Sequence, residues 1–149
     1  MPLDIFNVGF VGIISVSPIP WSIVGLTLIQ SKSISTEEQA PQDLFFKPDG
    51  TKMYLLGDDS DDITEFSLST AWDITTSSYD SVSFLVRAQV HYGAELTFST
   101  DGSQFFITSD KINEYAMTTS WDISTASHTR TSVTLPLGNA LMGALTTNS

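Results

Sequence analysis

Two stretches of this 149-residue chain are copies of one another. Residues 63–79 (ITEFSLSTAWDITTSSY) lie 49 positions before residues 112–128 (INEYAMTTSWDISTASH), and 8 of the 17 aligned positions are identical. Further upstream the offset becomes 52, because LFFKPDG at 44–50 aligns with LTFSTDG at 96–102. The three extra residues fall in the acidic segment 58–62, and insertions between repeats map to loops. The chain is therefore predicted to fold as an array of one structural unit.

The three tryptophans share one position of this repeat. Trp21 lies 51 residues before Trp72, and Trp121 lies 49 residues after it. Each tryptophan begins a W-x-I string, so we expect the three indoles to be structurally equivalent. Large aromatic side chains supply most of the buried area in small cores. We therefore predict that all three rings are largely buried between adjacent sheets.

Inside each copy the residue pattern has the period of strands. The runs are short, rich in aromatic and β-branched side chains, and bounded by Gly, Asp, Ser or Pro. No window has the apolar spacing of a long amphipathic helix. We therefore predict an all-β protein with four antiparallel strands in each copy. The predicted strands are 43–47, 52–57, 62–68 and 81–86 in the first copy, and 95–99, 103–108, 111–117 and 129–135 in the second.

An Asp-Gly pair separates the first two predicted strands of each copy. The pairs are Asp49 with Gly50 and Asp101 with Gly102. An Asp-Gly pair between two strand-like runs is typical of a tight hairpin turn. We interpret both aspartates as turn residues and not as catalytic carboxylates. The aspartate of each W-D-I string is likewise expected to cap a local turn, because its side chain competes for backbone donors.

These strings resemble the repeats of a known family. F-K-P-D-G-T-K-M-Y at 46–54 is similar to an element of YVTN-type and lactonase-like β-propellers, and L-S-T-x-W-D-I at 68–74 resembles the tandem repeats of bacterial and phage-associated propeller proteins. The resemblance covers about residues 43–135. It implies a four-stranded blade that buries its faces only against neighbouring blades. It implies no particular activity, since such propellers host unrelated functions.

The blade repeats account for only part of the chain. We divide the sequence into a degenerate partial blade at 1–42, two blade repeats at 43–92 and 93–138, and the start of a further first strand at 139–149. Closed propellers typically have four to eight blades, so two units with partial ends do not close a ring. We expect other copies of the chain to complete the assembly as a ring or a filament.

Charge and composition restrict the partners. The chain has 17 acidic and 6 basic side chains and a net charge of −11, so we expect no nucleic-acid partner. It has no cysteine, which excludes disulfides, thiolate zinc sites and cysteine nucleophiles. The apolar run at 5–16 suggests a leader or a membrane span. Pro18, Pro20 and the absence of a basic residue before Lys32 disfavour both, and we expect no membrane span.

One loop suggests a metal site. Asp58, Ser60 and Asp62 place oxygen-bearing side chains at alternate positions, as in the first half of a calcium-binding loop. The loop lacks a glycine at its sixth position and a glutamate at its twelfth, and the second copy has no such loop. A solvated hairpin loop is therefore favoured, with calcium as the alternative. We predict no other cofactor.

The remaining polar residues form no catalytic motif. Glu65 and Glu114 occupy equivalent points on the third strand and are expected to be partly solvated. His91 and His128 are not equivalent and have no clustered carboxylates beside them. The sequence contains no nucleophile elbow and no phosphate-binding glycine loop. We therefore expect no catalytic residues.

Three classes of function remain. The favoured one is a non-catalytic repeat scaffold, structural or binding, completed through its terminal strands and located outside the cell or on a virion. The second is a carbohydrate-binding adhesion module, which requires an exposed aromatic platform with adjacent carboxylates. The third is a fragment of a lactonase-like hydrolase, which requires acidic, Asn or His side chains that converge on a metal.

Overall fold

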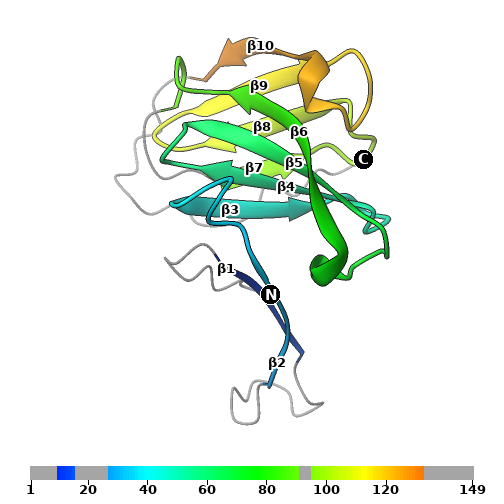
Figure 1. The fold of residues 1–149 in the computed structure, drawn as a ribbon. Helices are drawn as coiled ribbons and strands as arrows, with labels where there is room; N and C mark the ends of the chain where they lie inside the picture. The colour runs from blue at the N-terminus through cyan, green and yellow to red at the C-terminus, as the bar shows by residue number, and fades with distance from the viewer. Residues whose placement is uncertain (1–9, 16–26, 91–94, 133–149) are drawn as a thin grey trace, which may run out of the picture.

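The fold is known from a computed structural model that describes residues 10–15, 27–90 and 95–132 (Figure 1). These residues form strands joined by turns and two single-turn 3-10 helices, which confirms the predicted all-β class. Trp21, His91 and the segment 139–149 lie outside the described residues. The described part of the chain contains no helix long and apolar enough to cross a membrane.

The strands form two antiparallel meanders of four strands and one separate pair. Neighbouring strands in the chain are also neighbours in each meander, as short turns require. The middle sheet consists of β3 (Pro41–Phe46), β4 (Lys52–Gly57), β5 (Asp62–Leu68) and β6 (Ser77–Leu85), the C-terminal sheet of β7 (Glu95–Phe98), β8 (Gln104–Thr108), β9 (Ile112–Met117) and β10 (Ala126–Thr131), and the N-terminal pair of β1 (Phe10–Ser15) and β2 (Thr27–Ser33).

The fourth strand of each sheet begins earlier than predicted. β6 starts at Ser77 and β10 at Ala126, whereas the sequence suggested 81 and 129. The W-D-I segment is closed by a 3-10 helix, η1 (Ile74–Thr76) or η2 (Ile123–Thr125), and the backbone is extended directly after it. The polar residues that follow the helix therefore belong to the strand and not to a longer loop.

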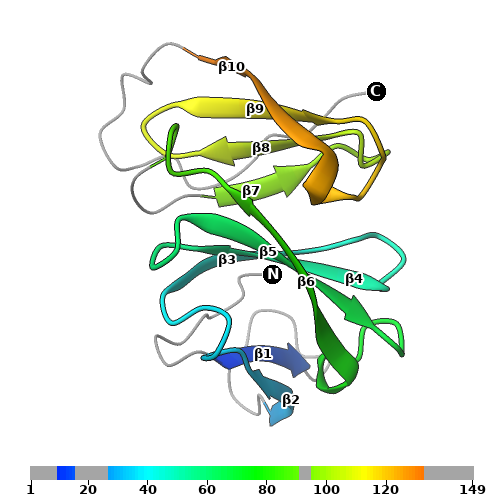
Figure 2. The ribbon, with the colours of Figure 1, turned by 45° about the horizontal axis from the view of Figure 1, so that its top comes forward.

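The middle and C-terminal sheets pack face to face, as Figure 2 shows. A single apolar cluster joins them, and its largest fully buried side chains are aromatic. Burial of this apolar surface is the main force that holds the two sheets together. The middle sheet contributes Phe45, Tyr54, Leu56, Ile63, Val82 and Phe84, and the C-terminal sheet contributes Leu96, Phe98, Phe105, Ile107, Tyr115 and Met117.

The opposite face of the middle sheet carries a second apolar cluster. Its residues occupy the same repeat positions as the residues that the C-terminal sheet directs toward the middle sheet. Each sheet thus presents one set of side chains toward the part of the chain that precedes it. The second cluster consists of Leu44, Phe46, Met53, Leu55, Phe66, Leu68 and Ile74, with Ile34 packed against them.

The N-terminal strand pair lies on this opposite face (Figure 2). β2 contacts η1, just as β6 contacts η2 at the next junction. The backbone N–H of Ile74 donates to the Gln30 side-chain oxygen at 3.0 Å, and Lys32 Nζ donates to the Ser77 carbonyl at 2.9 Å. β2 therefore packs against the middle sheet in the way that β6 packs against the C-terminal sheet.

Candidate functional site

The W-D-I corners of the two sheets have the same backbone geometry. Trp72 has φ +66° and Trp121 has φ +64°, which is uncommon for a bulky residue. The backbone N–H of each donates to the carbonyl of the turn glycine, Gly50 at 3.0 Å or Gly102 at 2.9 Å. A Cβ on either glycine would come within 2.5 Å of the indole ring. Glycine is required in both turns because the indole lies directly on the turn backbone.

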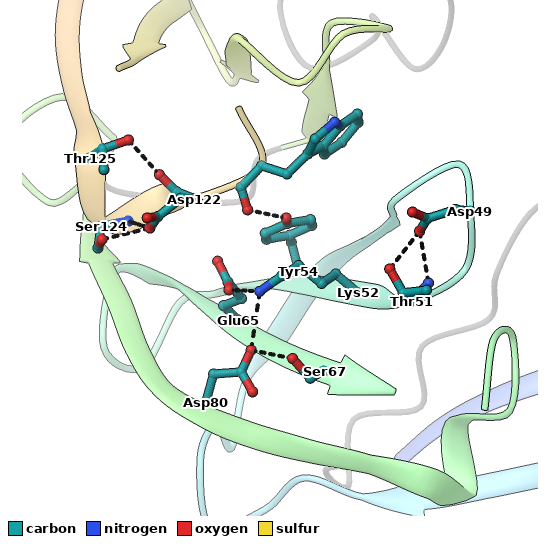
Figure 3. A network of polar contacts seen from close by, with 11 residues as sticks. Asp49, Thr51, Lys52, Tyr54, Glu65, Ser67, Asp80, Asp122, Ser124 and Thr125 are labelled. Carbon is teal, nitrogen blue, oxygen red and sulfur yellow. Dashed lines mark hydrogen bonds and ion pairs between the residues drawn. The ribbon is translucent and has the colours of Figure 1, made fainter. Parts of the chain in front are cut away.

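The aspartate of each corner caps its 3-10 helix, as the sequence predicted. Asp73 accepts a hydrogen bond from the backbone N–H of Thr75 at 3.0 Å and Asp122 from that of Ser124 at 3.1 Å. Each carboxylate also accepts from the hydroxyl of the same residue, at 2.6 Å. The Asp122 cap is visible in Figure 3. The caps hold the corner in place without any contribution from the neighbouring sheet.

Trp121 is covered by the preceding sheet. Its ring stacks on Phe98 of its own sheet at 5.5 Å and on two rings of the middle sheet, Phe45 of β3 at 6.3 Å and Tyr54 of β4 at 6.4 Å. The Tyr54 hydroxyl also donates to the Trp121 carbonyl at 2.7 Å (Figure 3). Burial raises the pKa of the Tyr54 phenol well above its usual value, so it remains a donor at physiological pH.

Trp72 is 49% exposed, so the prediction that it is buried between sheets is wrong. Its ring packs on Phe46, at 5.6 Å, just as Trp121 packs on the equivalent Phe98. The second contact is missing: no aromatic ring of a preceding sheet lies over Trp72 among the described residues. Within the described ranges, this side of the middle sheet has two strands, β1 and β2, whereas four strands lie at the next junction.

A partly buried ion-pair cluster lies close to the Trp121 corner (Figure 3). Lys52 of β4 pairs with Glu65 of β5 and with Asp80 of β6, the latter at 3.3 Å. Ser67 Oγ donates to the same Asp80 oxygen at 2.7 Å. Glu65 is only 4% exposed, so the expectation that it is partly solvated is wrong. The Glu65 side chain on β5 faces the neighbouring sheet, where the backbone N–H of Ile123 bonds to it, and not solvent.

One ammonium is shared by two carboxylates in this cluster, so Lys52 offsets only part of the negative charge. Burial raises the pKa of the Glu65 carboxyl, while Lys52 and the backbone N–H of Ile123 in the other sheet oppose that increase. Burial alone would lower the pKa of the Lys52 ammonium, but its bonds to Glu65 and Asp80 raise it. The cluster therefore holds three groups in place at the junction between the sheets.

Glu114, the repeat equivalent of Glu65, has different partners. Arg130 Nε donates to it at 2.7 Å, and Gln104, which replaces Lys52, donates at 3.2 Å. The Arg130 side chain is largely exposed, and its hydrogen bond lowers the pKa of Glu114. Because the two glutamates lie in different sheets with separate partners, they do not form a carboxylate pair.

A second link between the sheets was not predicted from the sequence. Asp43 at the start of the middle sheet accepts hydrogen bonds from the backbone N–H of Leu44 at 2.8 Å and of Leu96 in the C-terminal sheet at 2.7 Å. Burial raises the pKa of the Asp43 carboxyl above its usual value, although these two bonds oppose the increase. Nothing in the sequence distinguishes this aspartate, since its function depends on a residue 53 positions away.

Side chains of the acidic loop at 58–62 bond to one another and to neighbouring residues. Ser60 Oγ is hydrogen bonded to Asp62 Oδ1 at 2.7 Å and to Glu38 Oε2 at 3.0 Å. Glu38, which the sequence did not single out, is buried and also accepts from the backbone N–H of Ala40 at 2.6 Å. Asp58 is partly buried at the start of the loop. Within the described ranges no group of three or more His, Asp and Glu side chains is placed to hold a metal ion.

The turn aspartates and His128 also have local partners. Asp49 accepts from the backbone N–H of Thr51 and Asp101 from that of Ser103, both at 3.0 Å. The bond and charge of Lys47 help to lower the pKa of Asp49, and the bonds from Ser103 and Ser99 lower the pKa of Asp101 to about 2. The exposed His128 ring meets Tyr115 edge-on at 5.2 Å.

Comparison of the chain with protein-family models, with curated proteins and with solved structures finds no match. The internal repeat provides two equivalent corners, one covered by a neighbouring sheet and one open. The open corner presents an aromatic ring that is fixed on a glycine turn. Asp49 precedes this glycine and Asp73 follows the tryptophan in the chain, and both carboxylates are hydrogen bonded within the corner.

Proposed function

We propose that this chain is a non-catalytic scaffold of the β-propeller type, in which each four-stranded sheet is a blade that stacks on its neighbours. The observation that carries the proposal is the difference between the two tryptophan corners. Trp121 is packed against the preceding sheet, while Trp72 has the same geometry and is 49% exposed. We interpret the exposed indole as an interaction surface because its covered equivalent, Trp121, is in contact with a second sheet. The scaffold functions by packing this surface against strands of another chain.

The conspicuous charged groups support a structural function over a catalytic one. Glu65 is used in the ion-pair cluster with Lys52, and Glu114 is used in the pair with Arg130. Asp49 and Asp101 are used within their turns. A hydrolytic site of the lactonase type needs several such groups that converge on one point. The described carboxylates are instead distributed over separate structural contacts.

The molecular mass in solution tests this proposal. We expect the protein at micromolar concentration to scatter light as an assembly larger than its 16.2 kDa chain, either a closed ring or a filament. Trp72→Ala should shift the distribution toward the single chain. Leu85→Ala is the matched control, because Leu85 is also an exposed apolar residue but lies at the end of β6. A stable, monodisperse single chain would contradict the proposal.

Carbohydrate binding is a second candidate, favoured by the open face of Trp72. A flat indole with carboxylates beside it can stack on a sugar ring and accept hydrogen bonds from its hydroxyl groups. Titration with a panel of oligosaccharides, followed by tryptophan fluorescence, tests this function. A saturable response that Trp72→Ala abolishes would support it. Either function would suit an extracellular or virion-associated protein rich in Ser, Thr and acidic residues, which is the setting we propose.

A further inference from the structure

The N-terminal strand pair has an open edge. Among the described residues β1 pairs only with β2, in an antiparallel register that runs from Phe10 opposite Ser33 to Ser15 opposite Thr27. In the middle sheet, β5 and β6 form the corresponding pair, and β5 has a second partner, β4. The edge of β1 that corresponds to the β4 side of β5 therefore offers backbone donors and acceptors for one more strand.

The next junction indicates what belongs beside that edge. At Trp121 the two rings from the preceding sheet come from its first and second strands, Phe45 from β3 and Tyr54 from β4. These are the two strands that have no counterpart beside β1 among the described residues. The exposed face of Trp72 and the open edge of β1 thus have one common explanation: both lack the same two strands.

We propose that Trp72 and the open edge of β1 form an acceptor site for a β-hairpin of a second polypeptide. This inference rests on the proposed scaffold function and names its partner. The hairpin carries an aromatic residue on its first strand and a tyrosine on its second, at the positions of Phe45 and Tyr54. Its second strand adds to β1 through main-chain hydrogen bonds, as in other cases of strand addition. Its two rings stack on the indole of Trp72.

The space available favours a hairpin over a complete sheet. β2 already contacts η1, and its Gln30 side chain accepts from the backbone N–H of Ile74 at 3.0 Å. A four-stranded sheet placed on Trp72 would need its last two strands where β1 and β2 lie. A sugar would contact the ring of Trp72 but would leave the edge of β1 unpaired. Only a two-stranded segment satisfies both features.

The chain itself supplies a probe for this site. A synthetic peptide with the sequence of residues 41–57 contains β3, the turn and β4, including Phe45 and Tyr54. With a fluorescent label, its binding to the full-length protein is followed by anisotropy. We expect saturable binding that weakens about tenfold or more when the peptide carries both Phe45→Ala and Tyr54→Ala, because two aromatic contacts are lost.

Protein variants locate the site on the acceptor. Trp72→Ala should weaken peptide binding about tenfold, while Leu85→Ala should bind like the wild type. Circular dichroism checks that both variants are folded. Backbone hydrogen exchange gives a readout that does not depend on tryptophan: the peptide should slow exchange within residues 10–15. Equal binding of the wild-type and the Ala-substituted peptides, or unchanged exchange at 10–15, would overturn the inference.

The outcomes separate this inference from the proposed function. If the chain assembles in solution and Trp72→Ala weakens that assembly, but the peptide does not bind, the acceptor site is wrong and the scaffold function stands. If the peptide binds as described but the chain alone stays a single chain, the acceptor site stands and self-assembly is wrong. A saturable change in tryptophan fluorescence with an oligosaccharide, abolished by Trp72→Ala and without any binding of the peptide, would overturn the hairpin site in favour of carbohydrate binding.

Discussion

Trp72 and Trp121 are residues with one conformation and two environments. Both lie on a turn glycine with positive φ, but only Trp121 is stacked between two sheets. We expect Trp121→Ala to lower the free energy of unfolding by about 3 kcal/mol, the low end of the range for large core aromatics, because this partly buried ring packs against both sheets. Trp72→Ala should cost less than about 1 kcal/mol, since half of the side chain is already in water. Urea unfolding of the two variants measures the difference.

The two variants control for each other, because they remove the same side chain from equivalent positions. An equal loss of stability in both would mean that Trp72 is covered in solution, by assembly or by another part of the chain. Repeating the measurement over a range of protein concentrations identifies assembly, since only that contribution depends on concentration.

Asp101 gives a prediction about pH. Its pKa in the folded protein is about 2, below the ordinary value of 3.8, because Ser103 and Ser99 donate to the ionised carboxylate. A lowered folded-state pKa contributes stability that is complete above the unfolded-state value and is lost as the pH falls through about 2. We therefore expect Asp101→Asn to reduce the loss of melting temperature between pH 4 and pH 2. Thermal melts at these pH values measure it.

Asp59→Asn is the control for this experiment, because Asp59 is an exposed aspartate of the acidic loop. It should leave the acid dependence close to that of the wild type. If Asp101→Asn and the control lose melting temperature with acid as steeply as the wild type, the Asp101 turn does not contribute to acid sensitivity.

At the scale of elements, the junction between the sheets depends on Tyr54. Its hydroxyl is the only part that Tyr54→Phe removes, and the bond to the Trp121 carbonyl at 2.7 Å is lost with it. We expect a loss of about 0.5–1.5 kcal/mol in the free energy of unfolding, the usual net value of one hydrogen bond.

The matched control is Tyr79→Phe, which removes a hydroxyl from a tyrosine that is 37% exposed. Chemical denaturation of the two variants should show a loss only for Tyr54→Phe. A Tyr54→Phe protein as stable as the wild type would indicate that the junction is held by ring packing alone.

The acidic loop between β4 and β5 should not need a metal ion. Ser60 is hydrogen bonded to Asp62 and Glu38, and these bonds use groups that a calcium ion would require. We expect that a chelator leaves the melting temperature unchanged. A rise of several degrees on addition of millimolar calcium would contradict this prediction and identify the loop as a metal site.

At the scale of the whole molecule, assembly should depend on the N-terminal strand pair. Deleting residues 1–35 removes β1, β2 and Ile34, which is fully buried against the middle sheet. We expect the truncated protein to lose native assembly, as measured by light scattering, because the open edge of β1 is absent. Far-UV circular dichroism checks that the remaining sheets persist. Retained native assembly would show that this segment is dispensable.

Much of the fold was determined by the sequence alone, because it is written in short-range patterns. The alternation of apolar residues in 62–68 and 112–117, the Asp-Gly turns and the capping aspartates each act within a few residues. Two copies of such a pattern predict two similar sheets. The starts of the fourth strands were misplaced by three or four residues, since the polar residues after each 3-10 helix look like a loop.

Only the tertiary structure decided what covers each repeated position. Trp72 and Trp121 are equivalent in sequence, as are Glu65 and Glu114, yet one member of each pair is buried more deeply than the other. The buried member lies at the junction of the two four-stranded sheets. Burial depends on the surface that lies opposite, and that surface comes from residues about 50 positions away. The repeat therefore encodes the shape of each sheet. The exposure of Trp72 is decided instead by the strands that pack against its corner in the folded protein.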